Sequence, residues 1–207
     1  PTGTLQSGRA FENLQNIKDA GLIKHFGASV ETNDEALFCI RSSAATSLQI
    51  IFNIFRQRMI SGMLRAAKVN KVGLIARVPL ASGLLTGKFT LDHYFSDDDH
   101  RNYNANGKVF NVGETFAGVP FTTGIEFALE IEEILRDECP GATLAQKSLR
   151  WILDHEAIST VIPGAKSAEQ AKENAAAAAL PPLSADAHAK LAALYEAKID
   201  REVRGVF

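Results

Sequence analysis

Four short apolar runs are spaced along the chain, and each predicts a buried β-strand. They lie at residues 23–30, 47–54, 72–78 and 158–162. The runs are almost continuously apolar rather than alternating, which is typical of parallel strands that are covered on both faces.

Helical patterns separate these runs. Phe11, Leu14 and Ile17 recur at every third position and form one apolar stripe, which predicts an amphipathic helix over residues 8–20. Capping boxes at Thr32-Asn33-Asp34-Glu35 and Thr143-Leu144-Ala145-Gln146 begin two more helices. Together the patterns predict helices at 8–20, 32–41, 57–69, 143–154 and 184–200. Strands therefore alternate with helices four times, which predicts an α/β fold built on a parallel sheet.

Residues 86–120 interrupt this alternation. They show no periodicity, are rich in Gly, Asn and Asp, and include the aromatic residues Phe89, Tyr94, Phe95, Phe110 and Phe116. Irregular segments of this length are usually functional lids or disordered. The aromatic residues favour a lid that folds over a ligand. We expect the lid to have few contacts of its own and to depend on the ligand for its order.

Composition and charge exclude several classes of function. The chain has 207 residues and a net charge of −2, so it offers no electrostatic field that would hold nucleic acid or an anionic membrane. No apolar run approaches the length of a membrane span. The cysteines and histidines lack metal-ligand spacing, and we expect Cys39 and Cys139 to be buried thiols in a reducing, cytoplasmic compartment. Because the chain begins at Pro1 without Met, we expect it to be a piece of a longer protein.

Residues 162–174 carry the first candidate binding site. The sequence predicts the end of a strand, a tight turn with Lys166, and a helix that opens with the capping box of Ser167 and Gln170. Free N–H groups at a helix start and a nearby ammonium favour an anion such as phosphate. Gln170, Glu173 and Asn174 share one helical face, which suits a nucleotide. An ordinary capped helix with a solvated face explains the same spacing equally well.

Four motifs together resemble the aldo-keto reductases. They are GLIKHFGASV at 21–30, SLQIIFN at 47–53, IARVPLASGLLTGKF at 75–89 and VIPGAKSAEQAKEN at 161–174. The resemblance implies a (β/α)8 barrel of the TIM type that binds NADPH in an extended pose at the C-terminal ends of its strands. That family lacks the G-x-G-x-x-G fingerprint, which is also absent from this sequence.

The resemblance covers the second half of such a barrel, strands five to eight. A complete barrel takes about 250 residues, so we expect residues 1–207 to form a single domain of four β/α units, with 86–120 as a cofactor-covering loop. The catalytic Asp, Tyr, Lys and His of the family lie in its first half, and we assign no catalytic residue here. Tyr94, Tyr103 and Tyr195 fall in the lid or the last helix and are not substitutes. We expect two open sheet edges and a large uncovered apolar face, which the missing half or a second chain would complete.

The resemblance also implies a set of cofactor-binding residues. At the nicotinamide end they are Ser29, Gln49 and Arg77, although Val30 stands where a polar residue often follows the Ser. The pyrophosphate would lie along the backbone of Val78, Pro79, Leu80, Ala81 and Ser82, with Lys88 and Arg101 as the basic pair. The adenosine end would contact Gly164, Lys166, Gln170, Glu173 and Asn174.

Two of these assignments keep an alternative. Arg77 takes the place of an aromatic residue that often covers the nicotinamide ring in the family, so its guanidinium either lies near the ring and favours the reduced cofactor, or pairs with a loop carboxylate. Lys88 is otherwise a solvated loop lysine. Asn53, by contrast, is expected to bond loop backbone, and Trp151 to lie in the core.

Three functions compete at this point. The first is an oxidoreductase that uses NADPH to reduce an aldehyde or ketone, with a small-molecule carbonyl substrate. The second is a non-catalytic NADP-binding regulatory subunit of the same fold. The third is a phosphate-binding barrel enzyme such as an aldolase or isomerase, since phosphate sites after the last strands are common among barrels.

Overall fold

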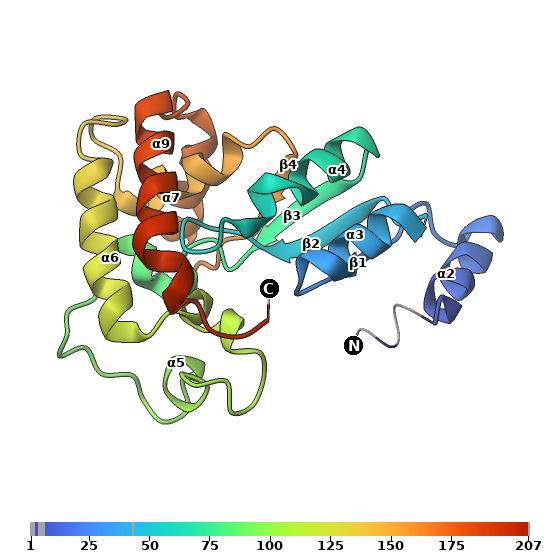
Figure 1. Ribbon diagram of the computed structural model, residues 1–207, viewed down its shortest axis with the longest axis horizontal. Helices are drawn as coiled ribbons and strands as arrows, with labels where there is room; N and C mark the ends of the chain where they lie inside the picture. Colours follow the sequence, from blue (N-terminus) through green and yellow to red (C-terminus); the bar gives the residue numbers. More distant parts are fainter. Residues whose placement is uncertain (1–2, 4–6, 43, 207) are drawn as a thin grey trace.

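The computed structural model describes residue 3 and residues 7–42 and 44–206, and its centre is a four-stranded parallel sheet. The strands lie in chain order, as Figure 1 shows. They are β1 (Gly27–Ser29), β2 (Ser47–Ile51), β3 (Gly73–Arg77) and β4 (Ile158–Val161). All four predicted strands are therefore present, in the predicted parallel arrangement, but each is shorter than its apolar run.

The polar contacts of Asn53 explain why β2 is short. Asn53 accepts a hydrogen bond from the N–H of Phe55 at 2.9 Å and donates one to the carbonyl of Val78 at 2.8 Å. The backbone therefore turns at Asn53 instead of continuing as a strand. The predicted structural role of Asn53 is confirmed.

Helices connect and flank the strands. They are α2 (Arg9–Asp19), α3 (Asn33–Ser42), α4 (Met63–Val69), α5 (His100–Tyr103), α6 (Phe121–Ile134), α7 (Leu144–Leu153), α8 (Ala168–Ala176) and α9 (Ala185–Leu194). Two of the three predicted capping boxes are confirmed by reciprocal bonds, between Thr32 and Glu35 and between Thr143 and Gln146. Two predicted helices are broken: 57–69 is interrupted at Gly62, and 184–200 changes to a π-helical turn at Tyr195.

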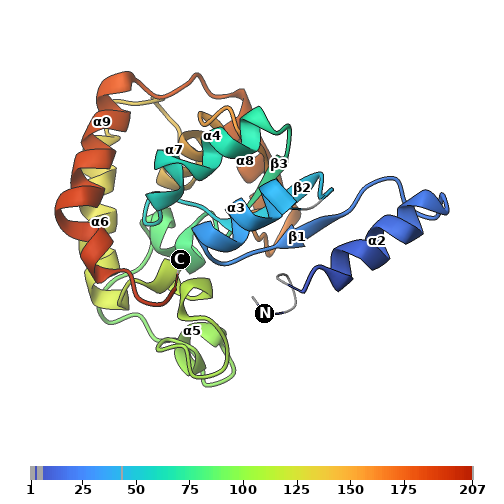
Figure 2. The same cartoon turned by 45° about the vertical axis from the view of Figure 1, so that its right-hand side comes forward.

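Helix α6 was absent from the sequence prediction. Its first turn, Thr122-Thr123-Gly124, has low helix propensity, so the local pattern is weak. Tertiary packing explains the helix, because a Cβ at Gly124 would lie 2.5 Å from a methyl carbon of Leu84. The glycine lets α6 cross closely over the loop that follows β3. In both views α6 also lies beside α9 (Figures 1 and 2).

One face of the sheet is covered and forms the core. Leu48 and Ile50 of β2 and Leu74 and Ala76 of β3 are fully buried on it. Helix α4 packs on β3 and α7 packs on β4. Helix α2 extends away from the sheet (Figures 1 and 2). Trp151 of α7 is also buried, stacked on Phe52 with ring centroids 5.2 Å apart, so its predicted core position is confirmed.

The opposite face is only partly covered, and it is not the large apolar face that we expected. Gly27 and Gly73 contribute no side chain to it, and apart from Ile75 the other exposed or half-exposed residues are polar: Ser29, Ser47, Gln49, Ser159 and Thr160. The glycines allow neighbouring side chains to lie across them, because a Cβ at Gly27 would collide with Ser47 and one at Gly73 would lie 3.1 Å from the Ser159 hydroxyl. Within the described residues, β1 pairs only with β2, and β4 only with β3.

The segment 86–120 is folded, and the expectation that it has few contacts of its own is wrong. Asn104 is fully buried, accepts hydrogen bonds from the N–H groups of Val109 and Phe110, and donates one to the Thr115 hydroxyl. Phe116 is buried as well. Asparagine bonds and aromatic packing thus supply the order that the sequence pattern did not reveal.

Two absences hold for the part of the chain that the structure describes. No described helix combines the length and apolar character that a membrane crossing requires. The described His, Cys, Asp and Glu residues form no cluster of three or more with the geometry of a metal site.

Candidate functional site

A cleft of about 680 Å³ opens at the C-terminal ends of β3 and β4. Its walls come from the loop after β3, from the segment 86–120 and from the turn before α8. The lining residues are Val78, Pro79, Leu80, Ser82, Gly83, Thr86, Lys88, Phe89, His100, Arg101, Glu114, Ile162, Gly164, Ala165, Lys166 and Gln170. Nine of the fifteen residues assigned to cofactor binding from the sequence are among them.

The loop after β3 has a strained backbone. Val78, Ala81 and Ser82 have φ values of 52°, 48° and 55°, a left-handed region that costs free energy for residues other than glycine. The Ser82 hydroxyl donates to the carbonyl of Glu114 at 3.2 Å and accepts from the N–H of Phe116 at 3.1 Å. Ala81 is fully buried below the loop, so its side chain does not reach the cleft.

The basic wall of the cleft consists of Lys88 and Arg101. The Arg101 guanidinium binds both oxygens of Asp99, the shortest bond being 2.6 Å, and its centre lies 4.5 Å from the ring centroid of Phe95. Arg101 holds the pKa of Asp99 well below its ordinary value, at about 2. The Lys88 side chain has no hydrogen bond or ion pair within the described residues. Arg101 is therefore oriented and charge-balanced, whereas Lys88 is available to an anion.

The turn before α8 forms the other end. Ser167 caps the helix by accepting from the N–H of Gln170 at 3.2 Å, as predicted. The Gln170 side chain, however, accepts from the N–H of Lys166 at 2.7 Å rather than from that of Ser167. The Lys166 ammonium has no partner within the described residues. Gly164, Lys166 and Gln170 therefore meet at the cleft.

Two residues assigned to the adenosine end lie elsewhere. Asn174 donates to the carbonyl of Gly164 at 3.2 Å and lines a separate groove beside Leu149 and Ala175. Glu173 is exposed on α8 and contributes its carbonyl to a bond from Gln146 at 3.0 Å. In this structure Asn174 supports the turn and faces α7, Glu173 stays exposed, and neither residue lines the cleft.

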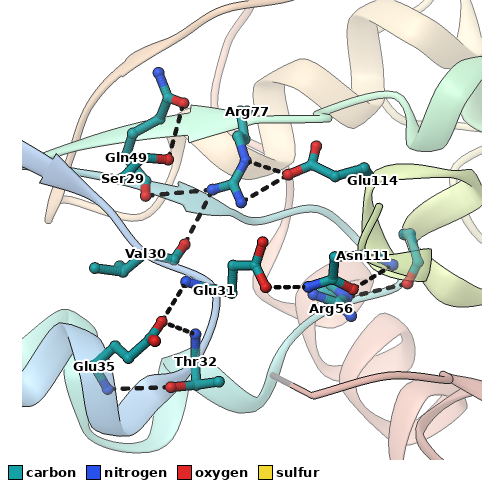
Figure 3. Close-up of polar contacts among 12 residues, drawn as sticks. Ser29, Val30, Glu31, Thr32, Glu35, Gln49, Arg56, Arg77, Asn111 and Glu114 are labelled. Atoms are coloured by element: carbon teal, nitrogen blue, oxygen red, sulfur yellow. Dashed lines mark hydrogen bonds and ion pairs between the residues drawn. The ribbon is translucent and has the colours of Figure 1, made fainter. Parts of the chain in front are cut away.

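The three residues assigned to the nicotinamide end lie together, outside the cleft (Figure 3). Ser29 and Gln49 are register partners on β1 and β2, and the Ser29 hydroxyl donates to the Gln49 side chain at 3.4 Å. Arg77 pairs with Glu114 of the loop at 2.8 Å. Of the two alternatives for Arg77, pairing with a loop carboxylate is therefore the one observed. Since the carboxylate balances the guanidinium, the charge effect expected on a nicotinamide ring loses its basis.

Sequence reasoning did not identify Glu114 or His100, which both line the cleft. Both stand in the segment without periodicity, where no pattern indicates which side chains turn inward. The sequence indicated Glu114 only indirectly, through the alternative that Arg77 pairs with an unspecified carboxylate of a loop.

Comparisons with known proteins agree with this architecture. The sequence profile of the Aldo/keto reductase family matches residues 3–196. Aldo-keto reductase YhdN of Bacillus subtilis is 27% identical over 160 residues, which is 77% of this chain and 45% of that protein. L-glyceraldehyde 3-phosphate reductase of Escherichia coli O157:H7 is 32% identical over 114 residues, covering 55% of this chain and 31% of the enzyme.

Solved structures show the same fold. The glycerol dehydrogenase AKR11B4 from Gluconobacter oxydans superposes with a TM-score of 0.68 at 19% identity, over 94% of this chain and 54% of that one. The chain thus spans about half the length of the solved structures and of the most broadly matched curated relatives. The profile match covers almost the whole sequence, and the chain belongs to the Aldo/keto reductase family.

Proposed function

We propose that the protein is an oxidoreductase that uses NADPH to reduce an aldehyde or ketone to an alcohol. In this proposal the chain contributes the four C-terminal β/α units of a (β/α)8 barrel. The observation that carries it is a pair of ammonium groups, those of Lys88 and Lys166, which have no partner in the described part of the chain and line one cleft from two different loops. A dinucleotide with a 2′-phosphate carries phosphate groups at two separate points, the diphosphate and the 2′-position. Two separated ammonium groups in one cleft match these two negative charges.

The residues present fit such a cofactor. The ammonium of Lys88 and the oriented guanidinium of Arg101 would hold the diphosphate against the backbone of residues 78–82. The Lys166 ammonium and the free N–H groups at the start of α8 would hold the 2′-phosphate. Ser29 and Gln49 would bond the nicotinamide carboxamide, since Gln49 presents its side-chain amide on the partly covered face of the sheet, next to the Ser29 hydroxyl. The cofactor, when bound, supplies the hydride.

The chain supplies no proton donor for the carbonyl oxygen among its described tyrosines. Tyr94 and Tyr103 are exposed and outside the cleft. Tyr195 is buried, donates to Asp200 at 2.6 Å, and burial raises the pKa of its hydroxyl. We therefore place the catalytic acid in β/α units contributed by the rest of the protein or by a second chain.

A second candidate is a non-catalytic NADP-binding subunit of the same fold. A relative named "Probable voltage-gated potassium channel subunit beta" from Arabidopsis thaliana, 31% identical over 117 residues, favours it. Another relative, Aldo-keto reductase yakc [NADP(+)] of Schizosaccharomyces pombe, is 26% identical over 168 residues and favours the enzyme. Turnover of carbonyl substrates by the complete protein separates the two.

The test of the cofactor assignment is Lys166→Met, titrated with NADPH and NADH by the fluorescence of the reduced nicotinamide. A charge-assisted contact contributes about 1.5–3 kcal/mol, so NADPH affinity is expected to fall by about tenfold or more. NADH lacks the 2′-phosphate, and its affinity is expected to stay nearly unchanged. The matched control is Lys172→Met, an exposed lysine on the same helix outside the cleft. An equal loss for both cofactors would mean that Lys166 only supports the turn.

A further inference from the structure

Arg77 joins three segments of the chain at one guanidinium group. Its Nε donates to Glu114 at 2.9 Å, and its Nη1 donates to the carbonyls of Val30 at 3.1 Å and Gln49 at 3.3 Å. The Val30 carbonyl directly follows β1 and the Gln49 carbonyl lies in the middle of β2, beside the side chains of Ser29 and Gln49 (Figure 3). One side chain thus connects the end of β1 and the middle of β2 to the loop that carries Glu114.

Glu114 is held from two sides. Its carboxylate binds Arg77, and its backbone carbonyl accepts the Ser82 hydroxyl at 3.2 Å. The same hydroxyl accepts from the N–H of Phe116. Three residues before Glu114, the Asn111 side chain donates to Glu31 at 2.6 Å. Residues 111–118, hereafter the anchor segment, are therefore attached to the sheet by side chains that come from distant parts of the sequence.

The ion pair is less exposed than the surface pairs of the protein. The side chains of Arg77 and Glu114 are 11% and 29% exposed, whereas those of Lys198 and Glu130 are 48% and 41% exposed. Solvent screens a partly buried pair less than an exposed one. Breaking the Arg77 pair is therefore expected to have a larger effect than breaking the exposed one.

The pair also controls the charge of the cleft. Glu114 lines the cleft into which, according to the proposed function, a polyanion binds. An unpaired carboxylate there would repel phosphate, and the guanidinium offsets it. Removal of either partner thus weakens the attachment of the anchor segment, which keeps its bonds to Ser82 and Glu31, but the two removals shift the charge of the cleft in opposite directions.

We propose that Arg77 and Glu114 are positioning residues that couple the strand pair carrying Ser29 and Gln49 to the anchor segment. This coupling sets the rate at which the dinucleotide is released, and the inference rests on the proposed function. Neither side chain needs to touch the reacting atoms. Arg77 holds the two strands, and Glu114 holds the wall of the cleft closed. Loss of the pair opens the wall without removing the groups that bind phosphate.

Two measurements test this on Arg77→Met, Glu114→Gln and the double variant. The first is hydrogen exchange of residues 112–118 without cofactor, in which the amide of Phe116 reports the bond to Ser82. Exchange is expected to rise about tenfold or more in each single variant. The double variant is expected to match the singles, because the same interaction is lost only once. Glu130→Gln, which breaks the exposed pair with Lys198, is the matched control and is expected to leave the segment unchanged.

The second measurement is stopped-flow binding of NADPH. The dissociation rate is expected to rise in both single variants, while the association rate falls for Arg77→Met and rises for Glu114→Gln because the cleft changes charge in opposite senses. Arg77→Lys keeps the charge and is expected to restore association more than it restores dissociation. The change in association reports charge alone; a merely structural role would lower the stability of the variants without raising the dissociation rate in both single variants.

The outcomes separate the inference from the proposed function. Unchanged exchange of residues 112–118 in folded Glu114→Gln, a substitution of nearly equal shape, overturns the inference even where NADPH binds. Increased exchange with unchanged dissociation also overturns it. If the wild-type protein binds no NADPH, the proposed function fails, and the release rate assigned to the pair fails with it. The exchange experiment would then still decide whether the pair holds the segment.

Discussion

Lys147 is expected to make the largest single electrostatic contribution to the stability of the helical layer formed by α6 and α7. Its ammonium is nearly buried and donates to the carbonyls of Leu135 at 2.8 Å and Arg136 at 3.2 Å. These carbonyls follow the last residue of α6, where the regular i to i+4 backbone bonds of the helix have ended; the Leu135 carbonyl also accepts from the N–H of Glu138 at 3.1 Å. A cation at this end also interacts favourably with the helix dipole.

The magnitude follows from these two bonds. Each hydrogen bond to a charged group contributes about 1.5–3 kcal/mol. Lys147→Met keeps the packing of the aliphatic stem, and the cost of burying an ammonium disappears, which offsets part of the loss. We expect the free energy of unfolding to fall by about 2–4 kcal/mol. With a urea dependence of about 2 kcal/mol per molar, the midpoint moves down by about 1–2 M.

Urea titration followed by circular dichroism measures this shift. Lys190→Met is the control, since Lys190 is exposed and pairs with the likewise exposed Asp186 one turn away. Its midpoint is expected to stay within error of the wild type. Lys147→Arg keeps a charged donor and is expected to retain part of the stability. If Lys147→Met has the same midpoint as Lys190→Met, the bonds to the end of α6 contribute no net stability and the reasoning is wrong.

Two further predictions concern pH and activity. Burial lowers the pKa of His155 below its ordinary value of about 6.5, so the unfolded chain takes up a proton more readily than the folded one. The free energy of unfolding therefore falls as the pH drops below that value, by at most about 1.4 kcal/mol per pH unit. His155→Gln is expected to flatten this pH dependence in urea titrations between pH 5 and 7, and an unchanged slope would assign the dependence to other groups. The 207-residue chain alone is expected to show no reductase activity with NADPH and a panel of aldehydes and ketones, because no described tyrosine hydroxyl reaches the cleft. Turnover near that of an ordinary enzyme would show that the catalytic acid lies in this chain.

The strands and the capped helix starts were predictable because their causes are local. A continuous apolar run identifies a covered parallel strand wherever it stands, and Thr32 with Glu35 satisfies free N–H groups within a single turn. The strand ends were less accurate, since Asn53 stops β2 through a bond to Val78, twenty-five residues away. A prediction from local pattern has no access to that partner.

The same limit explains the errors at the candidate site. Gln170 bonds the N–H of Lys166 rather than that of Ser167, which only the conformation of the turn decides. Asn174 has the helical spacing of a ligand contact but faces α7, because the direction of α8 relative to the cleft depends on packing. Helix α6 depends on the fit of Gly124 to Leu84. In each case the orientation of a side chain or helix depends on tertiary packing, which the residue types alone do not determine.

In the proposed barrel, the polar character of the partly covered sheet face has a consequence for the strands that would complete it. Barrel interiors are filled by layers of side chains from alternate strands, mostly bulky and branched. At the level of Gly27, Ser47 and Gly73 this chain contributes almost no side-chain volume. Interiors are packed to the density of organic crystals, so strands that complete a barrel here have to supply large side chains at that level. One level nearer the C-terminal ends, Ser29 and Gln49 contribute polar groups instead. Along the sheet, a level that side chains of other strands would fill is thus followed by a level that presents hydrogen-bonding groups. The hydrogen-bonding level is the one nearer the strand ends at which the cleft opens.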